Sequence, residues 1–441
     1  MKLAIDRAFA AFFAPFKATS RCWIAFSGGM DSTVLLTVAA AVREHLPGAL
    51  HAIHIDHGLH PDSALWAAHC QARCAELSIP LCIRHLALKP RAGDSVEAIA
   101  REARYRVFTE LLGADELLLS AHHQDDQAET LLLALLRGSG IQGLAAMPKM
   151  IPLGAGKLVR PFLSTSQAEL IEYAKSQQLT WIEDPSNQHL AFDRNYLRHK
   201  IIPLLQHRWP AASITLSRSA QHCGEATRLV EQFAAQALAN LGGSRPGTLN
   251  IHQVLQLELP LQNAVLRLWL KRRGFIAPNA RYLQRIQNEV LTARADASPV
   301  VAWNGCVIRR YRNDLFALSP LPAPPSPTAA PLLWSIGAVR TTCALPQGLG
   351  ELEWLPVERV EPLVLQVRFG VTRIRCLRDA GQTGVLKRLY QARGIPVWWR
   401  PYVPLVFHAE RLIALAGICQ CQAPELRGGK LHWNLEAQFM G

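Results

Sequence analysis

The stretch from Cys22 to Glu44, CWIAFSGGMDSTVLLTVAAAVRE, decides the fold. It opens with an apolar run of strand length, and the residues from Ser32 onwards have the apolar pattern of a buried helix. Between the two lies Ser27-Gly28-Gly29-Met30-Asp31-Ser32. Two adjacent glycines allow backbone angles that a side chain would forbid. The stretch therefore predicts a strand, a tight loop and a helix in direct succession.

This loop has the chemistry of an anion cradle, most naturally for phosphate. Its glycines let peptide N–H groups approach a ligand closely, two serine hydroxyls add donors, and the start of the helix adds a positive dipole. Asp31 would repel a bare phosphate, so it implies a bound Mg²⁺ or a water network between them. The structural alternative is an ordinary turn in which Asp31 caps the helix. The complete SGGxDS string in a strand–loop–helix context favours the cradle.

The rest of the first 212 residues continues the alternation of strand and helix. Predicted strands are Cys22–Phe26, Leu50–Asp56, Leu81–Leu86 and Glu116–Ala121, and predicted helices are Ser32–Glu44, Ala64–Leu77 and Ser95–Leu112. This rhythm predicts an α/β, Rossmann-like domain whose parallel sheet is covered by helices on both faces. Ligands of such sheets bind at the carboxyl ends of the strands.

The remaining chain divides by composition. Residues 213–319 carry apolar residues at three- and four-residue spacing, which indicates a helical domain. Residues 320–336 begin with PLPAPPSPTAAP, in which six of twelve residues are proline, and are predicted to form a stiff linker. Residues 337–441 contain alternating apolar runs, which predict a small β-rich C-terminal domain.

Composition narrows the class of protein. The chain has 441 residues with a formal net charge of +13, which favours a polyanionic partner. The sequence contains no run of 18 apolar residues, so no membrane span is predicted. The N-terminus does not resemble a secretory signal. The ten cysteines lack the regular spacing of a secreted disulfide scaffold. We therefore expect a cytoplasmic location and no membrane partner.

Further segments allow a family to be named. With the loop, they resemble the tRNA(Ile)-lysidine synthetase family of PP-loop N-type ATP pyrophosphatases. The resemblance is dense over residues 21–210 and returns at GVLKRLYQARGIPVWWRPYVPLVF, residues 384–407. The segments that carry it are HIDHGL at residues 54–59, HHQDDQAET at 122–130, EDPSN at 183–187 and RNYLR at 194–198.

The resemblance implies a reaction in two steps. ATP would adenylate the wobble cytidine of an isoleucine tRNA with a CAU anticodon, releasing pyrophosphate. The amine of free L-lysine would then displace AMP at C2 of the base, giving lysidine. ATP and Mg²⁺ are the implied cofactors. A homodimer is compatible with the sequence, which does not set the oligomeric state.

The resemblance also points to site residues. Asp126 and Glu129 are spaced by three on a predicted helix and share a face, so they are expected to orient the metal or the ammonium of lysine. The carboxylate that deprotonates the lysine is left open. Expected ATP-binding residues are Ser27, Gly28, Gly29, Met30, Asp31, Ser32, Asp56 and His57, and expected catalytic residues are Asp31, Asp125, Asp126, Glu129 and Arg104.

Basic residues supply the expected RNA contacts. Residues 267–312 contain ten Lys and Arg against two acids, a net charge of +8. Trp398 and Trp399 are interpreted either as core residues or as RNA-stacking residues. For Arg194 and Arg198 the competing interpretation is ion pairing on a helix surface. The expected RNA contacts are Arg194, Arg198, Arg272, Arg273, Lys387 and Arg388.

Three alternatives to lysidine formation at a magnesium-dependent site are compatible with parts of the sequence. A zinc site is the weaker interpretation of the histidine-flanked acids, because no HExxH pattern accompanies them. Another PP-loop RNA-modifying enzyme, such as a tRNA thiolase, would share the loop, but the chain lacks the C-x-x-C expected of the iron–sulfur thiolases. A non-catalytic RNA-binding protein would bind tRNA without ATP turnover. The intact SGGMDS and DDQAET strings count against that last alternative.

Overall fold

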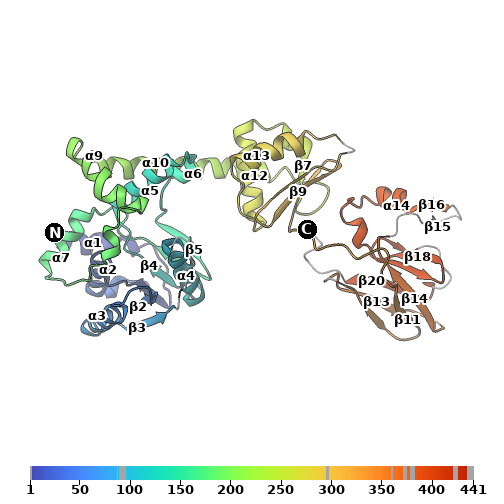
Figure 1. Cartoon of the computed structure of the whole chain (residues 1–441), viewed down its shortest axis with the longest axis horizontal. Helices are drawn as coiled ribbons and strands as arrows, with labels where there is room; N and C mark the ends of the chain where they lie inside the picture. Colours follow the sequence, from blue (N-terminus) through green and yellow to red (C-terminus); the bar gives the residue numbers. More distant parts are fainter. Residues whose placement is uncertain are drawn as a thin grey trace. The chain divides into compact units, whose positions relative to one another are not determined.

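The computed structural model describes residues 2–86, 88, 96–294, 297–346, 348–358, 361–370, 375–377, 383–420 and 426–434. The chain forms two compact units, residues 1–229 and 230–441. The boundary between them falls within one long helix, α10 (Ala212–Leu238). Figure 1 labels the elements of both units.

The first unit is built on a six-stranded sheet in the order β3-β2-β1-β4-β6-β5. All neighbouring strands are parallel except β5 and β6, which form an antiparallel hairpin. The predicted α/β class with a parallel sheet is confirmed, whereas the hairpin of two four-residue strands was not predicted. The strands are β1 (Arg21–Ala25), β2 (Ala49–Asp56), β3 (Leu81–His85), β4 (Leu117–Leu119), β5 (Met150–Leu153) and β6 (Gly156–Val159).

Helices follow the strands as the sequence predicts. The helix after the glycine loop begins at Met30, two residues before the predicted start, and the predicted Ser95 lies outside the described residues. The helices of this unit are α1 (Lys2–Phe13), α2 (Met30–Ala41), α3 (Ser63–Glu76), α4 (Val96–Leu111), α5 (Gln124–Leu136), α6 (Ile141–Leu144), α7 (Gln167–Ser176), α8 (Asp193–Tyr196) and α9 (Ile202–Arg208), with a π-helical turn at Leu197–Ile201 between the last two.

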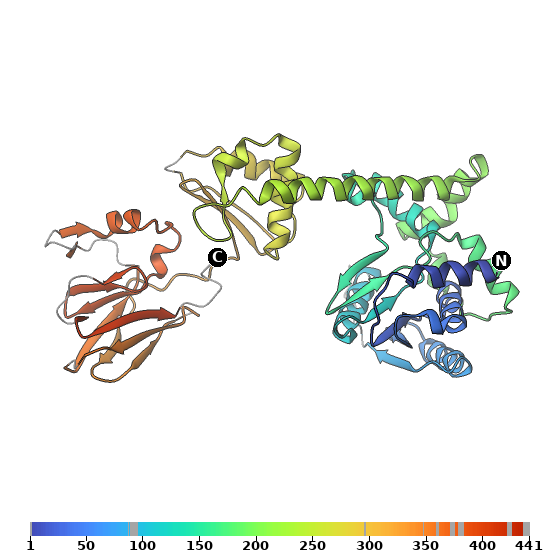
Figure 2. The same ribbon diagram turned by 180° about the vertical axis from the view of Figure 1, so that it is seen from behind.

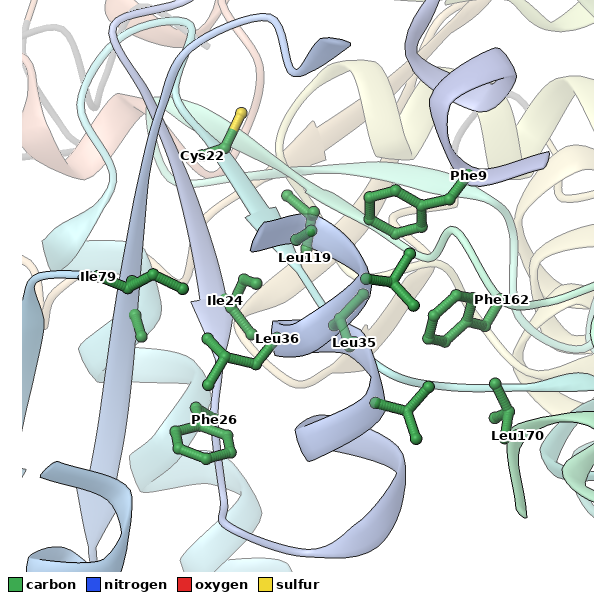
Figure 3. Close-up of a cluster of buried hydrophobic side chains, with 14 of the residues drawn as sticks. Phe9, Cys22, Ile24, Phe26, Leu35, Leu36, Ile79, Leu119, Phe162 and Leu170 are labelled. Atoms are coloured by element: carbon green, nitrogen blue, oxygen red, sulfur yellow. The ribbon is translucent and has the colours of Figure 1, made fainter. Parts of the chain in front are cut away.

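Alternating side chains of the first strand bury both faces of the sheet. Cys22, Ile24 and Phe26 point to the face covered by α1, α2, α3 and α7. Trp23 points to the opposite face, where it belongs to a second buried cluster that includes Phe108 of α4. Figure 3 shows the first of these clusters, with residues of α2 lying among those of β1 and β4. Because both faces are covered, the strand ends at the sheet edge are where polar side chains meet.

The second unit begins with a mixed domain. Its helices confirm the helical region predicted from residue 213, and α10 is the longest of them. The structure adds a four-stranded antiparallel sheet, β7-β10-β9-β8, which the sequence analysis did not predict. The elements are α11 (Ile251–Leu255), α12 (Leu259–Arg272), α13 (Ala280–Arg285), a π-helical segment η4 (Ile286–Leu291), β7 (Leu249–Asn250), β8 (Val300–Trp303), β9 (Cys306–Tyr311) and β10 (Asp314–Leu318).

A β-rich domain with its own core closes the chain, as predicted. The linker predicted over residues 320–336 is too long at its C-terminal end, because residues 332–336 pair with β14 as strand β11. Proline confines only the first part of that segment to an extended, unpaired backbone. The elements are β11 (Leu332–Ile336), β12 (Thr341–Ala344), β13 (Glu351–Pro356), β14 (Leu363–Arg368), β15 (Arg375–Leu377), β16 (Thr383–Val385), α14 (Leu386–Ala392), β17 (Leu405–His408), β18 (Arg411–Leu415), β19 (Cys419–Gln420) and β20 (Gly429–Asn434).

Figure 2 shows the same chain from behind, with α10 and the sheet of the first unit in view. Among the helices that the structure describes, none is long and apolar enough to cross a membrane.

Candidate active site

The glycine loop connects β1 to α2 and has a backbone that only glycine accommodates. Gly28 has a φ of 86°, in the left-handed region. A Cβ atom at Gly28 would lie 2.5 Å from Cδ1 of Ile182. The Ile182 N–H also donates to the Gly28 carbonyl oxygen at 2.9 Å. The loop is therefore pinned between the sheet and the segment that follows α7.

Hydroxyl groups organise the start of α2. The Oγ atoms of Ser27 and Ser32 lie 3.1 Å apart, and Ser32 Oγ donates to the Gly29 carbonyl oxygen at 2.9 Å. Gly29 is the N-cap residue and has no side chain to accept from the first N–H groups of the helix. These N–H groups and the dipole of α2 favour an anion at this end. Met30 is the first residue of the helix, so its N–H belongs to the same set.

Asp31 brings the loop next to the acidic segment that precedes α5. Its Oδ2 lies 3.7 Å from Nε2 of His123, and its side chain is 33% exposed. Its other oxygen, Oδ1, is buried, and within the described part of the chain no group hydrogen-bonds to it. A buried carboxylate oxygen without a partner is costly unless a cation or an ordered water binds it. Oδ1 of Asp31 is therefore available to bind the Mg²⁺ or the ordered water that the sequence predicts between this carboxylate and a phosphate.

His123 sits among three carboxylates. Its ring is 1% exposed and lies 3.4 Å from Oδ2 of Asp126 and 3.8 Å from Oδ2 of Asp125. Burial alone would lower the pKa of His123, but Asp31, Asp126 and Asp125 together raise it above its ordinary value. The imidazolium form is thus favoured, and it offsets part of the negative charge. No role for His123 was predicted from the sequence. Its position after a strand end, beside two acids, is the signal that could have indicated a site residue.

Asp126 and Glu129 share one face of α5, as predicted, and two arginines bind them both. Arg194 donates from Nη2 to Asp126 Oδ1 at 2.8 Å and from Nε to Glu129 Oε2 at 2.6 Å. Arg198 donates to the same Asp126 oxygen at 2.8 Å and to Glu129 Oε1 at 2.6 Å. We call Asp126, Glu129, Arg194 and Arg198 the acid–arginine cluster.

Burial makes the acid–arginine cluster electrostatically strong. The Glu129 side chain is 1% exposed, while those of Arg194 and Arg198 are 26% and 29% exposed. Burial would raise the pKa of Asp126, but His123 and the two arginines lower it to about 2. The RNA contacts predicted for Arg194 and Arg198 stay predictions, and the structure shows ion pairs for both side chains. Their guanidinium groups are bound to buried acids, which is the ion-pairing alternative, because a buried carboxylate needs a cation close by.

Asp125 has a structural partner on another helix. Its Oδ2 accepts from the backbone N–H of Gln167, the first residue of α7, at 2.9 Å. An acid at the N-terminus of a helix is stabilising. Asp125 thus ties α5 to α7, while its neighbour Asp126 serves the acid–arginine cluster.

The end of β2 gathers the other predicted residues. Asp56 accepts from the Gly58 N–H at 2.8 Å and lies 3.0 Å from Nδ1 of His85, so its carboxylate closes the turn after the strand. Nε2 of His57 lies 3.3 Å from Nη2 of Arg104. Burial and the Arg104 guanidinium lower the pKa of His57 to about 4, so the imidazole is neutral at pH 7 and accepts from Arg104. Arg104 itself is exposed.

The remaining predicted RNA contacts differ in exposure. Arg272, Lys387 and Arg388 are exposed. Arg273 is half-buried and donates from Nη1 to the Gly247 carbonyl oxygen at 3.3 Å, so it also holds the fold of the second unit. Trp398 is buried against Phe316, with ring centroids 5.3 Å apart, which favours the core interpretation for this residue.

The acids of the site do not by themselves form a metal centre within the described part of the chain. Among the described residues, no group of three or more His, Cys, Asp or Glu side chains is arranged to hold a metal ion by itself. Asp126 and Glu129 instead have arginine partners. A metal at this site therefore needs further ligands from a substrate such as a polyphosphate.

Known proteins resemble the chain along its whole length. Family models match residues 1–205 as a PP-loop domain, residues 249–316 as a TilS substrate binding domain and residues 365–437 as a TilS substrate C-terminal domain. A tRNA(Ile)-lysidine synthase from Coxiella burnetii is 39% identical over 438 residues, which cover 97% of this chain and 95% of that protein. One from Methylococcus capsulatus is 38% identical over 450 residues, covering 98% and 100%. A solved U34-tRNA thiolase from Methanococcus maripaludis is 16% identical, with a TM-score of 0.43 over 50% of this chain and 77% of that one.

Proposed function

The chain belongs to the tRNA(Ile)-lysidine synthase family, and from this premise we propose that it ligates L-lysine to C2 of the wobble cytidine of the CAU-anticodon isoleucine tRNA. ATP adenylates the cytidine, and lysine then displaces AMP, so the products are lysidine, AMP and diphosphate. The observation that carries the proposal is the contact between the glycine loop and the acidic segment at the start of α5. Asp31 of the glycine loop lies 3.7 Å from His123, which also contacts Asp126.

The glycine loop is proposed to hold the polyphosphate of ATP. The close approach at Gly28 and the uncapped N–H groups of α2 suit an anionic ligand, and the hydroxyls of Ser27 and Ser32 add donors. Such preorganised donors stabilise the charge that develops on a phosphate during displacement. Asp56, His57 and Arg104 are proposed to bind the nucleotide or the cytidine base from the neighbouring strand end, since β2 pairs in parallel with β1.

Mg²⁺ is proposed to reach the site with ATP. The unpartnered Oδ1 of Asp31 fits a metal held jointly by this carboxylate and by phosphate oxygens. When bound, the ion offsets negative charge on the phosphates. Asp31 is thus proposed as the residue of this chain that orients it.

Lysine is proposed to bind at the acid–arginine cluster. An ammonium that binds Asp126 and Glu129 has to share their oxygens with Arg194 and Arg198. Binding also has to be followed by loss of a proton, because an ammonium has no lone pair with which to attack. A carboxylate of this site is the proposed acceptor. Arg194 and Arg198 are thereby proposed as positioning residues.

The exposed Arg272, Lys387 and Arg388 are proposed to contact tRNA phosphates. A cytoplasmic location and a homodimer stay predictions, which cell fractionation and sedimentation analysis test.

Mass analysis of isoleucine tRNA after incubation with ATP and isotope-labelled lysine tests the function. We expect the label to be retained on the CAU-anticodon tRNA, with one AMP formed for each lysine attached. Pyrophosphate release measured with each amino acid in turn separates this activity from that of another PP-loop enzyme. Lysine-independent modification of the tRNA would refute the proposal.

A further inference from the structure

A cavity of about 480 Å³ opens in the second unit between α12 and the helical segment formed by α13 and η4. Five amide side chains and one arginine, Arg267, line it together with four apolar residues and a threonine, and none of the described lining residues is acidic or aromatic. The amides are Gln262, Asn263, Gln284, Gln287 and Asn288. We call this cavity the amide groove.

The amides lie on the facing sides of two helical segments because of their spacing. Asn263 and Arg267 are four residues apart on α12, and Gln284 is three residues from Gln287 on the opposite wall. Gln287 Nε2 donates to Asn263 Oδ1 at 2.9 Å, which joins the two walls. Each of these two amides keeps a further polar group for a ligand, since an amide has both donors and acceptors.

Arg267 is a half-buried cation to which no described residue offers a hydrogen bond or an ion pair. Its neighbours differ in this respect: Arg285 pairs with Glu289 at 2.7 Å, and Arg310 donates to the carbonyl oxygens of Leu291 and Ala293. A partly desolvated guanidinium without a partner favours an anionic ligand. The amide groove therefore combines one free positive charge with groups that hydrogen-bond to neutral edges.

We propose that the amide groove binds an unpaired nucleotide of the tRNA, with its phosphate on Arg267 and its base edge or 2′-hydroxyl on the amides. This inference rests on the proposed function, because it takes tRNA as the substrate. Asn and Gln side chains match the donor–acceptor edges of bases, and single-stranded nucleotides expose those edges. A concave site admits a splayed nucleotide, whereas a paired helix presents a convex surface.

Equilibrium binding of tRNA to the full chain over a range of salt concentrations tests the amide groove. Arg267→Ala should raise the Kd about tenfold and reduce the salt slope by about one. Gln284→Ala should raise the Kd about threefold without changing that slope, because an amide releases no counterion. Gln284 is exposed. Matched controls are Arg208→Ala and Gln236→Ala, exposed residues outside both the groove and the basic stretch of residues 267–312, which should leave the Kd unchanged.

Chemical probing of the bound tRNA identifies the occupant. We expect unpaired nucleotides that are protected by the wild-type protein to become reactive with Arg267→Ala and Gln284→Ala. Equal Kd values for groove variants and controls, or protection confined to paired nucleotides, would overturn the inference. Lysidine formation by the wild-type protein is scored separately. Its absence would refute the proposed function, whereas its presence with an unaltered Kd in both groove variants would refute the amide groove alone.

Discussion

Arg198 donates from Nε to Oε1 of Glu129 at 2.6 Å, although the two residues are 69 positions apart in the chain. This contact joins the turn after α8 to the middle of α5, directly beside Asp126. It converts two separately predicted sets of residues, the acids and the RNYLR arginines, into one cluster.

Removal of Glu129 should destabilise the first unit. Glu129→Gln removes one of the two carboxylates that bind the arginines and leaves Asp126 as their sole acidic partner in the cluster, and breaking a buried ion pair costs about 3–5 kcal/mol. Because both arginines are partly exposed, we expect a loss near the lower end, about 3 kcal/mol, measured by urea unfolding. A double-mutant cycle with Arg198→Ala should show coupling above about 1 kcal/mol. Additive effects would contradict the cluster.

Arg198→Ala should alter the use of lysine more than the use of ATP. If lysine shares Asp126 and Glu129 with the arginines, this variant changes the KM for lysine severalfold while the KM for ATP moves little. Steady-state kinetics with each substrate varied in turn measures the split. Arg208→Ala, a basic residue on α9 that forms no ion pair with the described acids, is the matched control. An equal change in both KM values would argue against a lysine site here.

Asp31→Asn should abolish AMP formation without weakening tRNA binding. The substitution keeps the size of the side chain and removes the charge proposed to orient Mg²⁺, so we expect kcat to fall at least about 100-fold. Asp62→Asn, at an exposed acid before α3, is the control and should keep wild-type turnover. Near-normal activity of Asp31→Asn would remove Asp31 from the mechanism.

Gly28→Ala should be more damaging than Gly138→Ala. Both glycines have a positive φ, 86° and 66°, so both variants carry backbone strain of about 1 kcal/mol. Only at Gly28 does the added Cβ meet a neighbour, Ile182 Cδ1, at 2.5 Å, whereas at Gly138 nothing lies within 4 Å. Thermal unfolding and ATP binding measure the difference. Equal losses in the two variants would mean that the packing of the loop against Ile182 is unimportant.

The stability of the first unit should fall as the pH drops from about 4 to about 2. The folded pKa of Asp126, about 2, lies below its ordinary value of 3.8. A carboxylate with a depressed pKa stabilises the fold above its unfolded pKa, and this contribution is lost as the pH falls through the folded value. Unfolding free energies measured between pH 2 and pH 5 should have a shallower slope in Asp126→Asn than in the wild-type chain. An unchanged slope would contradict the assigned pKa.

The amino-acid sequence was sufficient to predict the parallel strands of the first unit and the loop that begins the site, but not the hairpin of β5 and β6. Strand and helix periodicities are local, and the glycine pair at residues 28 and 29 favours a turn, so β1 was predicted within one residue, the start of α2 within two and its end within three. The shared face of Asp126 and Glu129 also follows from helical spacing alone. The short strands β8, β9 and β10 were missed although they form local hairpins joined by two-residue turns. The Asn304-Gly305 pair between β8 and β9 is a hairpin signal that was available in the sequence.

The ion pairs of the acid–arginine cluster depend on the tertiary fold. The spacing of RNYLR fits a solvated helix face, an RNA contact or an ion pair equally well. Folding places Arg194 and Arg198 against acids 65–72 positions earlier in the chain, and it buries those acids where water no longer screens them. The strength of a charge depends on its surroundings in space. For that reason the anion-binding chemistry of the glycine loop could be predicted from its residues, whereas the arginine partners of Asp126 and Glu129 could be identified only from the folded chain.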